Sequence, residues 1–177
     1  MGKLQALDLL TRVFIPRAGV THAGAEGEIG SVCAAIEELD LEGNPLGGWP
    51  DVLSIASELP KLSWLGLNDL RLDPLDALPA NFARGLGGLR ALCLNGTGMP
   101  WAQLQLIAGG LPELEELHFN GNGVSSLAPV ATAPGGALPL SRLVTLFIED
   151  NELSSWDEVS HLQNLEKLQV PRRRRHH

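Results

Sequence analysis

One spacing of apolar residues recurs along the chain and constrains its fold more than any other feature. In the clearest copy, five residues stand at relative positions 1, 4, 6, 9 and 11: Leu114, Leu117, Phe119, Asn122 and Val124. Leu117 and Phe119 alternate with polar residues, which is the pattern of a short strand with one buried face. Asn122 stands where the chain must turn. Asparagine can adopt left-handed backbone angles there, and its side-chain amide can hydrogen-bond neighbouring backbone groups. One such unit cannot bury its apolar side chains alone, so the spacing predicts further copies.

Copies of this spacing run through the whole chain. They begin at Leu4, Ile36, Leu62, Leu89, Leu114, Leu143 and Leu165. The starts are 32, 26, 27, 25, 29 and 22 residues apart, and this motif at a period of about 20 to 29 residues is the signature of leucine-rich repeats. Arg12 takes the asparagine position in the first copy, and Leu70 takes it in the third. The sequence predicts an α/β leucine-rich repeat solenoid of about seven repeats, with a curved parallel β-sheet on the concave side and helices and loops on the convex side.

Three tryptophans follow the repeat motif at similar distances. Trp49, Trp101 and Trp156 each begin an apolar stripe of helical period. The stripes continue as Val52, Ala56 and Leu59, as Leu104, Ala108 and Leu111, and as Val159, Leu162 and Leu165. Because each Trp is in phase with its stripe, we predict that the indoles fill the corners between strand and convex helix. The alternative is a row of exposed docking aromatics.

The remaining connections are less regular. The glycine-rich segment Val20 to Glu28 precedes a helical stripe from Ile29 to Ile36. A turn of this kind can hold phosphate, but the G-x-x-x-x-G-K-[ST] motif is absent, which favours a simple turn. Proline and glycine interrupt Asp73 to Leu89 and Ser125 to Ser141, so we expect no long helix there and mobility in the second segment.

Composition describes an ordinary globular chain. It has 177 residues, of which 44% are hydrophobic and 19% are charged. No apolar run reaches the length of about 18 residues needed to span a membrane, and the N-terminus lacks the pattern of a signal peptide. We therefore expect a cytoplasmic location, with Cys33 and Cys93 as reduced structural thiols.

Both ends look cut, because solenoids need polar caps on their terminal repeats. We expect residues 1–171 to be a single leucine-rich repeat domain from a longer protein. The tail 172–177 reads RRRRHH and is interpreted as an expression-tag remnant, with a basic patch as the alternative. Four of the 13 Lys and Arg residues lie in this tail, so the rest carries 9 against 21 acidic residues, a formal charge of −12 instead of −8.

Much of that negative charge falls on the predicted concave face. Relative positions 2, 3, 5, 7 and 8 point outward from the strands, and 11 acidic residues occupy them: Asp8, Glu37, Glu38, Asp40, Glu42, Asp69, Glu115, Glu116, Glu149, Asp150 and Glu166. Only Arg90 and Lys167 oppose them. Trp64, His118 and Phe147 stand at the centre, where large exposed aromatics favour a docking surface over a merely solvated face. The candidate partner-binding residues are Glu38, Asp40, Glu42, Trp64, Asn68, Asn95, Glu116, His118, Phe147 and Glu149.

Catalysis and nucleic-acid binding are disfavoured. Outside the tail the only histidines are His22, His118 and His161, and none lies in a metal or hydrolase motif. We therefore expect no enzyme activity, no catalytic or metal-binding residues and no cofactor. A negative face also repels phosphate backbones, so nucleic acid is not an expected partner, and no membrane partner is expected.

Three stretches resemble the leucine-rich domain of tubulin-folding cofactor E and cofactor E-like proteins. They are LDLEGNPLGGWPDVLSIASELPKLSWLGL (39–67), LCLNGTGMPWAQLQLIAGGLPELEELHFNGNGV (92–124) and LFIEDNELSSWDEVSHLQNLEKLQV (146–170). The resemblance implies a chaperone that captures α-tubulin and works with other tubulin-folding cofactors to assemble or dissociate the α/β-tubulin heterodimer. It also implies a cytoskeleton-associated cytoplasmic protein. The family's CAP-Gly and ubiquitin-like domains are not recognisable here.

The acidic concave face would repel the acidic tail of tubulin, so we expect it to meet a basic, folded surface of tubulin or of another cofactor. The isolated domain is expected to be a monomer. The main alternative is a generic leucine-rich scaffold, such as a phosphatase-regulating protein with repeats near 22 residues and no tubulin specificity. An RNA-associated adaptor of the same fold is a second alternative, which the charge of −12 makes less attractive.

Overall fold

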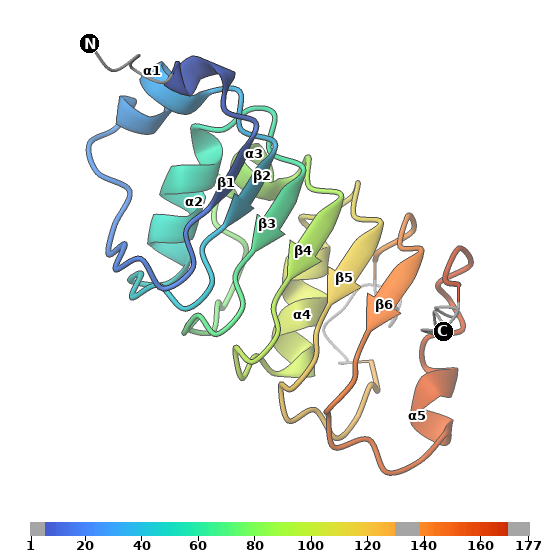
Figure 1. Ribbon diagram of the computed structural model, residues 1–177. Coiled ribbons are helices and arrows are strands. Elements are labelled where there is room, and N and C mark those ends of the chain that lie inside the picture. Colours follow the sequence, from blue (N-terminus) through green and yellow to red (C-terminus); the bar gives the residue numbers. More distant parts are fainter. Residues whose placement is uncertain (1–5, 130–138, 170–177) are drawn as a thin grey trace, which may run out of the picture.

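The chain folds around a single parallel β-sheet. The computed structural model describes residues 6–129 and 139–169. Its strands are β1 (Arg12–Phe14), β2 (Glu38–Asp40), β3 (Trp64–Gly66), β4 (Ala91–Cys93), β5 (Glu116–His118) and β6 (Thr145–Phe147). All neighbouring pairs are parallel, and the strands lie in the sheet in their sequence order (Figure 1). The predicted α/β class with a parallel sheet is therefore confirmed.

Helices occupy the connections between strands. They are a 3₁₀ turn, η1 (Leu7–Leu9), and the α-helices α1 (Glu28–Cys33), α2 (Trp49–Ser57), α3 (Phe82–Leu86), α4 (Trp101–Ala108) and α5 (Asp157–Ser160). Helices α2, α3 and α4 lie on one face of the sheet and leave the other face open (Figure 1). No long helix occurs between Asp73 and Leu89, as predicted. The connection 125–141 forms no helix in its described parts, and its predicted mobility concerns residues 130–138, which lie outside them.

The repeated leucines form the core between sheet and helices. Position 4 of the motif supplies the central residue of each strand from β2 to β6, and these residues are at most 8% exposed: Leu39, Leu65, Leu92, Leu117 and Leu146. They pair with one another along the sheet. Full burial of a leucine side chain stabilises a fold by about 1.5–3 kcal/mol, so this row and its neighbours at position 6 hold the sheet against the helices.

The asparagines at position 9 satisfy backbone groups where the chain leaves the sheet. The Nδ2 of Asn44 donates to the carbonyl oxygens of Leu41 (2.8 Å) and Ile15 (2.9 Å). The Nδ2 of Asn151 donates in the same way to Ile148 (3.0 Å) and Phe119 (2.9 Å). Each amide thus joins its own turn to the preceding one. Leu70 cannot do so, yet β3 and β4 pair in register around it.

The predicted left-handed backbone lies one residue earlier than Asn122. Position 8 has a positive φ in every described repeat, at Arg17, Gly43, Asp69, Gly96, Gly121 and Asp150. Asn122 instead bonds with its side chain, whose Nδ2 donates to the carbonyl of Leu94 at 3.0 Å. The assignment of left-handed angles to Asn122 was therefore wrong, whereas its bonding role is confirmed.

The register of the first repeat was also predicted wrongly. Its strand is Arg12–Phe14, with Val13 aligned to Leu39, so the copy begins at Leu10 and not at Leu4. The interval to Ile36 becomes 26 residues, equal to the next interval. Leu7 and Leu9 belong to the 3₁₀ turn and are 44% and 73% exposed, because the core lies under Val13 and Ile15 instead.

The three tryptophans do not share one environment. Trp49 and Trp101 are 2% and 6% exposed, as predicted for corner-filling residues. The ring of Trp49 lies 5.7 Å from that of Phe82, and the ring of Trp101 lies 6.1 Å from that of Phe119. In both cases the covering aromatic comes from the next repeat. Trp156 is 88% exposed, so its predicted burial was wrong.

The C-terminal copy has no strand in the described residues, which end at Gln169. Leu165 is buried, and the Gln169 amide donates to the Val144 carbonyl at 2.7 Å. Val170 and the tail 172–177 lie outside the described residues. Over the described ranges, no helix has the length and apolar character needed to cross a membrane.

Candidate partner-binding face

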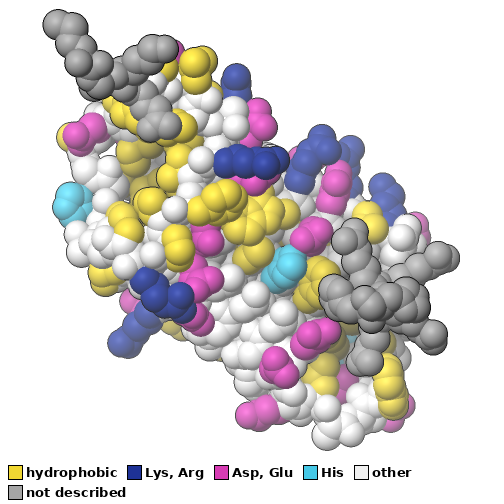
Figure 2. Space-filling model, viewed as in Figure 1, with side chains coloured by type: hydrophobic (Ala, Val, Ile, Leu, Met, Phe, Trp, Pro, Cys, Tyr) yellow, Lys and Arg dark blue, Asp and Glu magenta, His cyan; other side chains and the backbone are white. Residues whose placement is uncertain are grey.

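The side of the sheet without helices carries two rows of side chains, which we call the open face. Position 3 gives Arg12, Glu38, Trp64, Ala91, Glu116 and Thr145, and position 5 gives Phe14, Asp40, Gly66, Cys93, His118 and Phe147. Figure 2 shows an apolar patch on this side of the sheet, bordered by acidic and basic side chains and by a histidine. The face is therefore mixed in character and not uniformly acidic.

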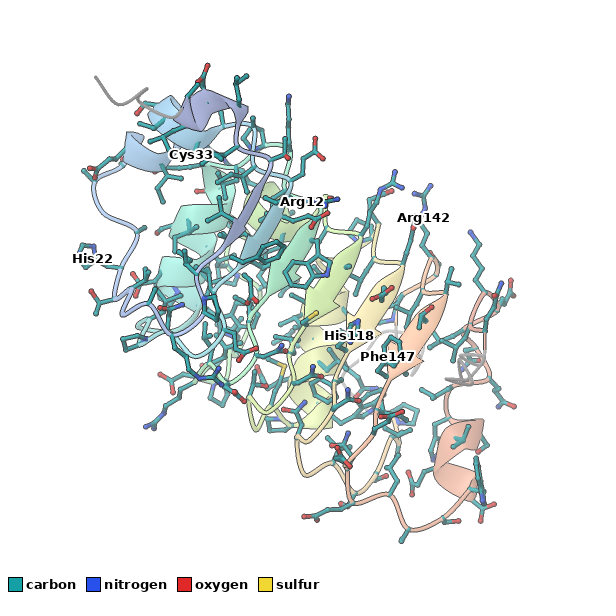
Figure 3. All side chains as sticks on the ribbon, viewed as in Figure 1. Arg12, His22, Cys33, His118, Arg142 and Phe147 are labelled. Carbon is teal, nitrogen blue, oxygen red and sulfur yellow. The ribbon has the colours of Figure 1, made fainter. Side chains whose placement is uncertain are left out.

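Two aromatic pairs stand on the open face. The rings of Phe14 and Trp64 meet edge to face, with centroids 6.0 Å apart. The rings of His118 and Phe147 are stacked at 4.3 Å, and Figure 3 shows them side by side on β5 and β6. Trp64, His118 and Phe147 are half-buried, and Phe14 is 54% exposed. The structure thus brings the predicted central aromatics onto one surface and adds Phe14, which the wrong first register had missed.

Gly66 lets the first aromatic pair form. A Cβ atom at this position would stand 2.9 Å from Cη2 of Trp64 and 2.6 Å from Oδ1 of Asp40. The indole and the carboxylate therefore lie over the bare backbone of β3. No spacing in the sequence marks Gly66 as special, because its role depends on where the Trp64 side chain folds.

Arginines from the first repeat neutralise part of the acidic face. Arg12 Nε lies 3.1 Å from Glu38 Oε1, and Figure 3 shows Arg12 beside the open face. Arg17 bridges two further repeats, with Nη1 2.6 Å from Glu42 Oε1 and Nη2 2.8 Å from Asp69 Oδ2. In the predicted register Asp8 stood on this face and these arginines did not. Asp8 lies instead in the exposed 3₁₀ turn.

Asn68 and Asn95 form a ladder along the end of the sheet. The Asn68 Oδ1 accepts a hydrogen bond from the Asn95 amide at 2.9 Å, and the Asn95 Oδ1 accepts one from the Asn120 amide at 2.8 Å. The Asn120 Oδ1 in turn accepts from the amide of Glu149 at 2.7 Å. Their side-chain carbonyl oxygens therefore bond the neighbouring repeats, and the Nδ2 of Asn68 donates to Glu42 Oε2 at 3.5 Å. Glu149 is exposed.

The centre of the open face has a negative electrostatic character. Glu116 Oε1 lies 2.6 Å from His118 Nε2. Asp40 Oδ1 accepts a hydrogen bond from the Glu42 amide at 2.9 Å. Burial raises the pKa of the Cys93 thiol to about 12, and the charges of Glu116 and Asp40 add to the effect. Cys93 is therefore a protonated, neutral thiol between two carboxylates at physiological pH.

Alternative sites are weaker. In the described ranges, no three His, Cys, Asp or Glu side chains are grouped so that they could hold a metal ion. A polar cavity of about 370 Å³ lies beside the glycine-rich turn before α1. Arg84 and His22 line it, but so do three carboxylates, Glu26, Asp51 and Glu58, which disfavour a phosphate ligand.

No family model matches the chain. Tubulin-folding cofactor E of Arabidopsis thaliana is 32% identical over 169 residues, or 94% of this chain. The tubulin-specific chaperone cofactor E-like protein of Homo sapiens is 34% identical over 156 residues, or 88% of the chain. The chain is a homologue of cofactor E and cofactor E-like proteins.

The match to these cofactor E relatives covers most of this chain but little of theirs. Tubulin-specific chaperone E of Xenopus laevis is 31% identical over 92% of the chain, which corresponds to 30% of that protein. The share is 30% for the Arabidopsis protein and 35% for the human E-like protein. The chain therefore spans about a third of the length of the curated relatives it matches, and the resemblance described above is confirmed over that third.

Proposed function

We propose that this chain is the leucine-rich repeat domain of a tubulin-folding chaperone of the cofactor E type. The observation that carries the proposal is the similarity to proteins named for tubulin folding over about nine-tenths of the chain. The sequential parallel sheet, with helices on one face, supports a leucine-rich repeat solenoid made of residues 1–171. Action on tubulin would place the protein in the cytoplasm.

The open face is the surface that we propose for the partner, α-tubulin or another folding cofactor. Its aromatic pairs supply apolar contact area, and aromatic side chains commonly dominate the energy of protein interfaces. Asp40, Glu116 and Glu149 supply negative charge for a basic, folded surface. Glu38 and Glu42 contribute less net charge, because Arg12 and Arg17 already pair with them. The domain acts by binding, without a catalytic step.

Co-elution with α/β-tubulin in size-exclusion chromatography tests this proposal. The wild-type chain is compared at low and moderate salt with Trp64→Ala, which removes an open-face aromatic. Trp156→Ala is the matched control, since Trp156 is exposed outside the open face. We expect Trp64→Ala to weaken binding by about 30-fold, the effect of losing a hot spot of roughly 2 kcal/mol. Trp156→Ala should bind like the wild type.

Two results would contradict the proposal in different ways. If the wild-type chain does not co-elute at either salt concentration, this domain does not hold tubulin by itself. If Trp64→Ala and Trp156→Ala both bind like the wild type, the partner does not use the open face.

A further inference from the structure

The two aromatic pairs of the open face flank a strand with small side chains. Trp64 on β3 aligns with Ala91 on β4, and Ala91 aligns with Glu116 on β5. In the second row, Gly66 aligns with Cys93, and Cys93 with His118. Adjacent strands are about 4.8 Å apart, so the backbones of β3 and β5, which carry Trp64 and His118, stand roughly 10 Å apart across β4. Because the side chains of Ala91 and Cys93 are small, they project less from β4 than the aromatic side chains project from β3 and β5.

Carboxylates border the same surface on both sides. Asp40 lies over Gly66, beside Trp64, and Glu116 lies beside His118. Both charges act on the Cys93 thiol between them, which is why they contribute to its raised pKa. Among the ion pairs of the described residues, Asp40 has no arginine or lysine partner, and the partner of Glu116 is His118. Negative potential therefore converges over β4.

The described arginines of the first and fourth repeats, Arg12, Arg17 and Arg90, pair with carboxylates away from β4. Arg12 and Arg17 hold Glu38, Glu42 and Asp69 at the β1 edge. Arg90 precedes β4 and lies 3.6 Å from Glu115. Within residues 6–129 and 139–169, no arginine or lysine pairs with Asp40 or Glu116, so a partner can supply a cation there.

We propose that the surface over β4, bounded by Trp64, His118, Asp40 and Glu116, binds the guanidinium group of one arginine on the surface of a partner protein. We call it the β4 cation site. A cation within about 6 Å of an indole ring is attracted by the ring quadrupole. Arginine fits better than lysine, because its guanidinium is planar, stacks on aromatic rings and can bond a carboxylate with two N–H groups. The site rests on the proposed function, since it names the group that a protein partner presents.

Small arginine analogues test the site without tubulin. The probe is N-acetyl-arginine methylamide, and its matched control is N-acetyl-citrulline methylamide, which has a similar shape and no charge. Binding is followed by the ¹H and ¹⁵N shifts of the Trp64 indole N–H, assigned through a Trp64→Phe variant. We expect a saturable shift with the arginine probe at millimolar concentrations and a far smaller one with citrulline. Equal shifts with both probes, or none with arginine, would overturn the proposal.

Charge-neutralising variants locate the cation. Asp40→Asn and Glu116→Gln keep side-chain shape and should each weaken the arginine probe about two- to fivefold, as expected for exposed ion pairs. Glu152→Gln is the control, because Glu152 is exposed and lies beyond β6, outside the open face. Equal weakening by all three would indicate a general effect of net charge and contradict a localised site.

The same variants separate this inference from the proposed function. If the arginine probe binds and tubulin does not co-elute, the tubulin assignment fails and the β4 cation site stands. If tubulin co-elutes equally with the wild type and with the Asp40→Asn, Glu116→Gln double variant, and the arginine probe does not bind, the cation site fails and the chaperone assignment stands.

Discussion

The Oε2 atom of Glu58 accepts a hydrogen bond from the backbone amide of Gly30 at 2.8 Å, and its Oε1 atom accepts one from Gly27 at 2.7 Å. These bonds join the residue that follows α2 to the first turn of α1, across 28 to 31 positions of sequence. They also lower the pKa of Glu58 below its ordinary value, because the amides of Gly30 and Gly27 bond the ionised form.

Glu58→Gln should therefore destabilise the fold in a pH-dependent way. A carboxylate with a lowered folded-state pKa contributes stability above its ordinary pKa of about 4.3 and loses that contribution as the pH falls through the folded-state value. Urea midpoints should be lower than wild type at pH 7 and converge toward it at acidic pH. Glu26→Gln, at an exposed neighbour, is the control and should show no such convergence. A constant difference at all pH values would contradict the assignment.

Gly66→Ala should disturb the first aromatic pair. The added methyl group would meet the Trp64 ring at 2.9 Å and the Asp40 carboxylate at 2.6 Å, so both must move. We expect a loss of about 1–3 kcal/mol in unfolding free energy, the usual cost of overpacking, and a changed environment for the Trp64 indole. Gly88→Ala is the control, because the nearest atom to its Cβ would be 3.9 Å away. Equal stability of the two variants would show that Trp64 does not lie over Gly66.

Replacing a buried corner tryptophan should lower the unfolding free energy far more than replacing the exposed one. Trp101→Ala removes a 6%-exposed ring that packs on Phe119 and should cost about 3–5 kcal/mol. Trp156→Ala removes an 88%-exposed ring and should change the unfolding free energy by less than about 0.5 kcal/mol. Chemical denaturation of both variants measures the difference. A large loss for Trp156→Ala would mean that another segment covers it in solution.

Thiol alkylation should distinguish the two free cysteines. Cys93 is 5% exposed and its pKa is raised to about 12, so almost no reactive thiolate is present at pH 8. Cys33 is half-buried and should react first with iodoacetamide. In a Cys33→Ser variant, Cys93 should be protected in the folded state by more than about a hundredfold relative to urea-unfolded chain. Fast labelling without urea would show that the centre of the open face opens readily.

The spacing of leucines predicts most of the sheet because it records which side chains are buried. Leu39, Leu65, Leu92, Leu117 and Leu146 align one with another in the structure as they do in the motif. The leucine spacing placed the first strand wrongly because Val13 and Ile15 replace leucines and no asparagine follows. Its signals were the β-branched, alternating segment TRVFI and an interval of 32 residues, the longest in the chain.

The candidate face was predictable in outline but not in its charge balance. Strand alternation identifies Trp64, His118 and Phe147 as outward residues, and the structure places them there. The bridges of Arg17 to Glu42 and Asp69 depend on side-chain reach across three repeats, which spacing does not encode. The prediction that Trp156 is buried was wrong for a related reason. Trp49 packs against Phe82 of the following repeat, whereas Trp156 has no such aromatic partner among the described residues.

The sequential order of the strands has a mechanical consequence. Each strand from β2 to β5 pairs only with the strands immediately before and after it in the chain. A protease cut in the loop between β4 and β5 would therefore leave β1 to β4 with all of their mutual ladders, and it would sever no long-range pairing among them. Unfolding under tension applied to the two ends should then proceed by peeling one terminal strand at a time, with the inner ladders released last.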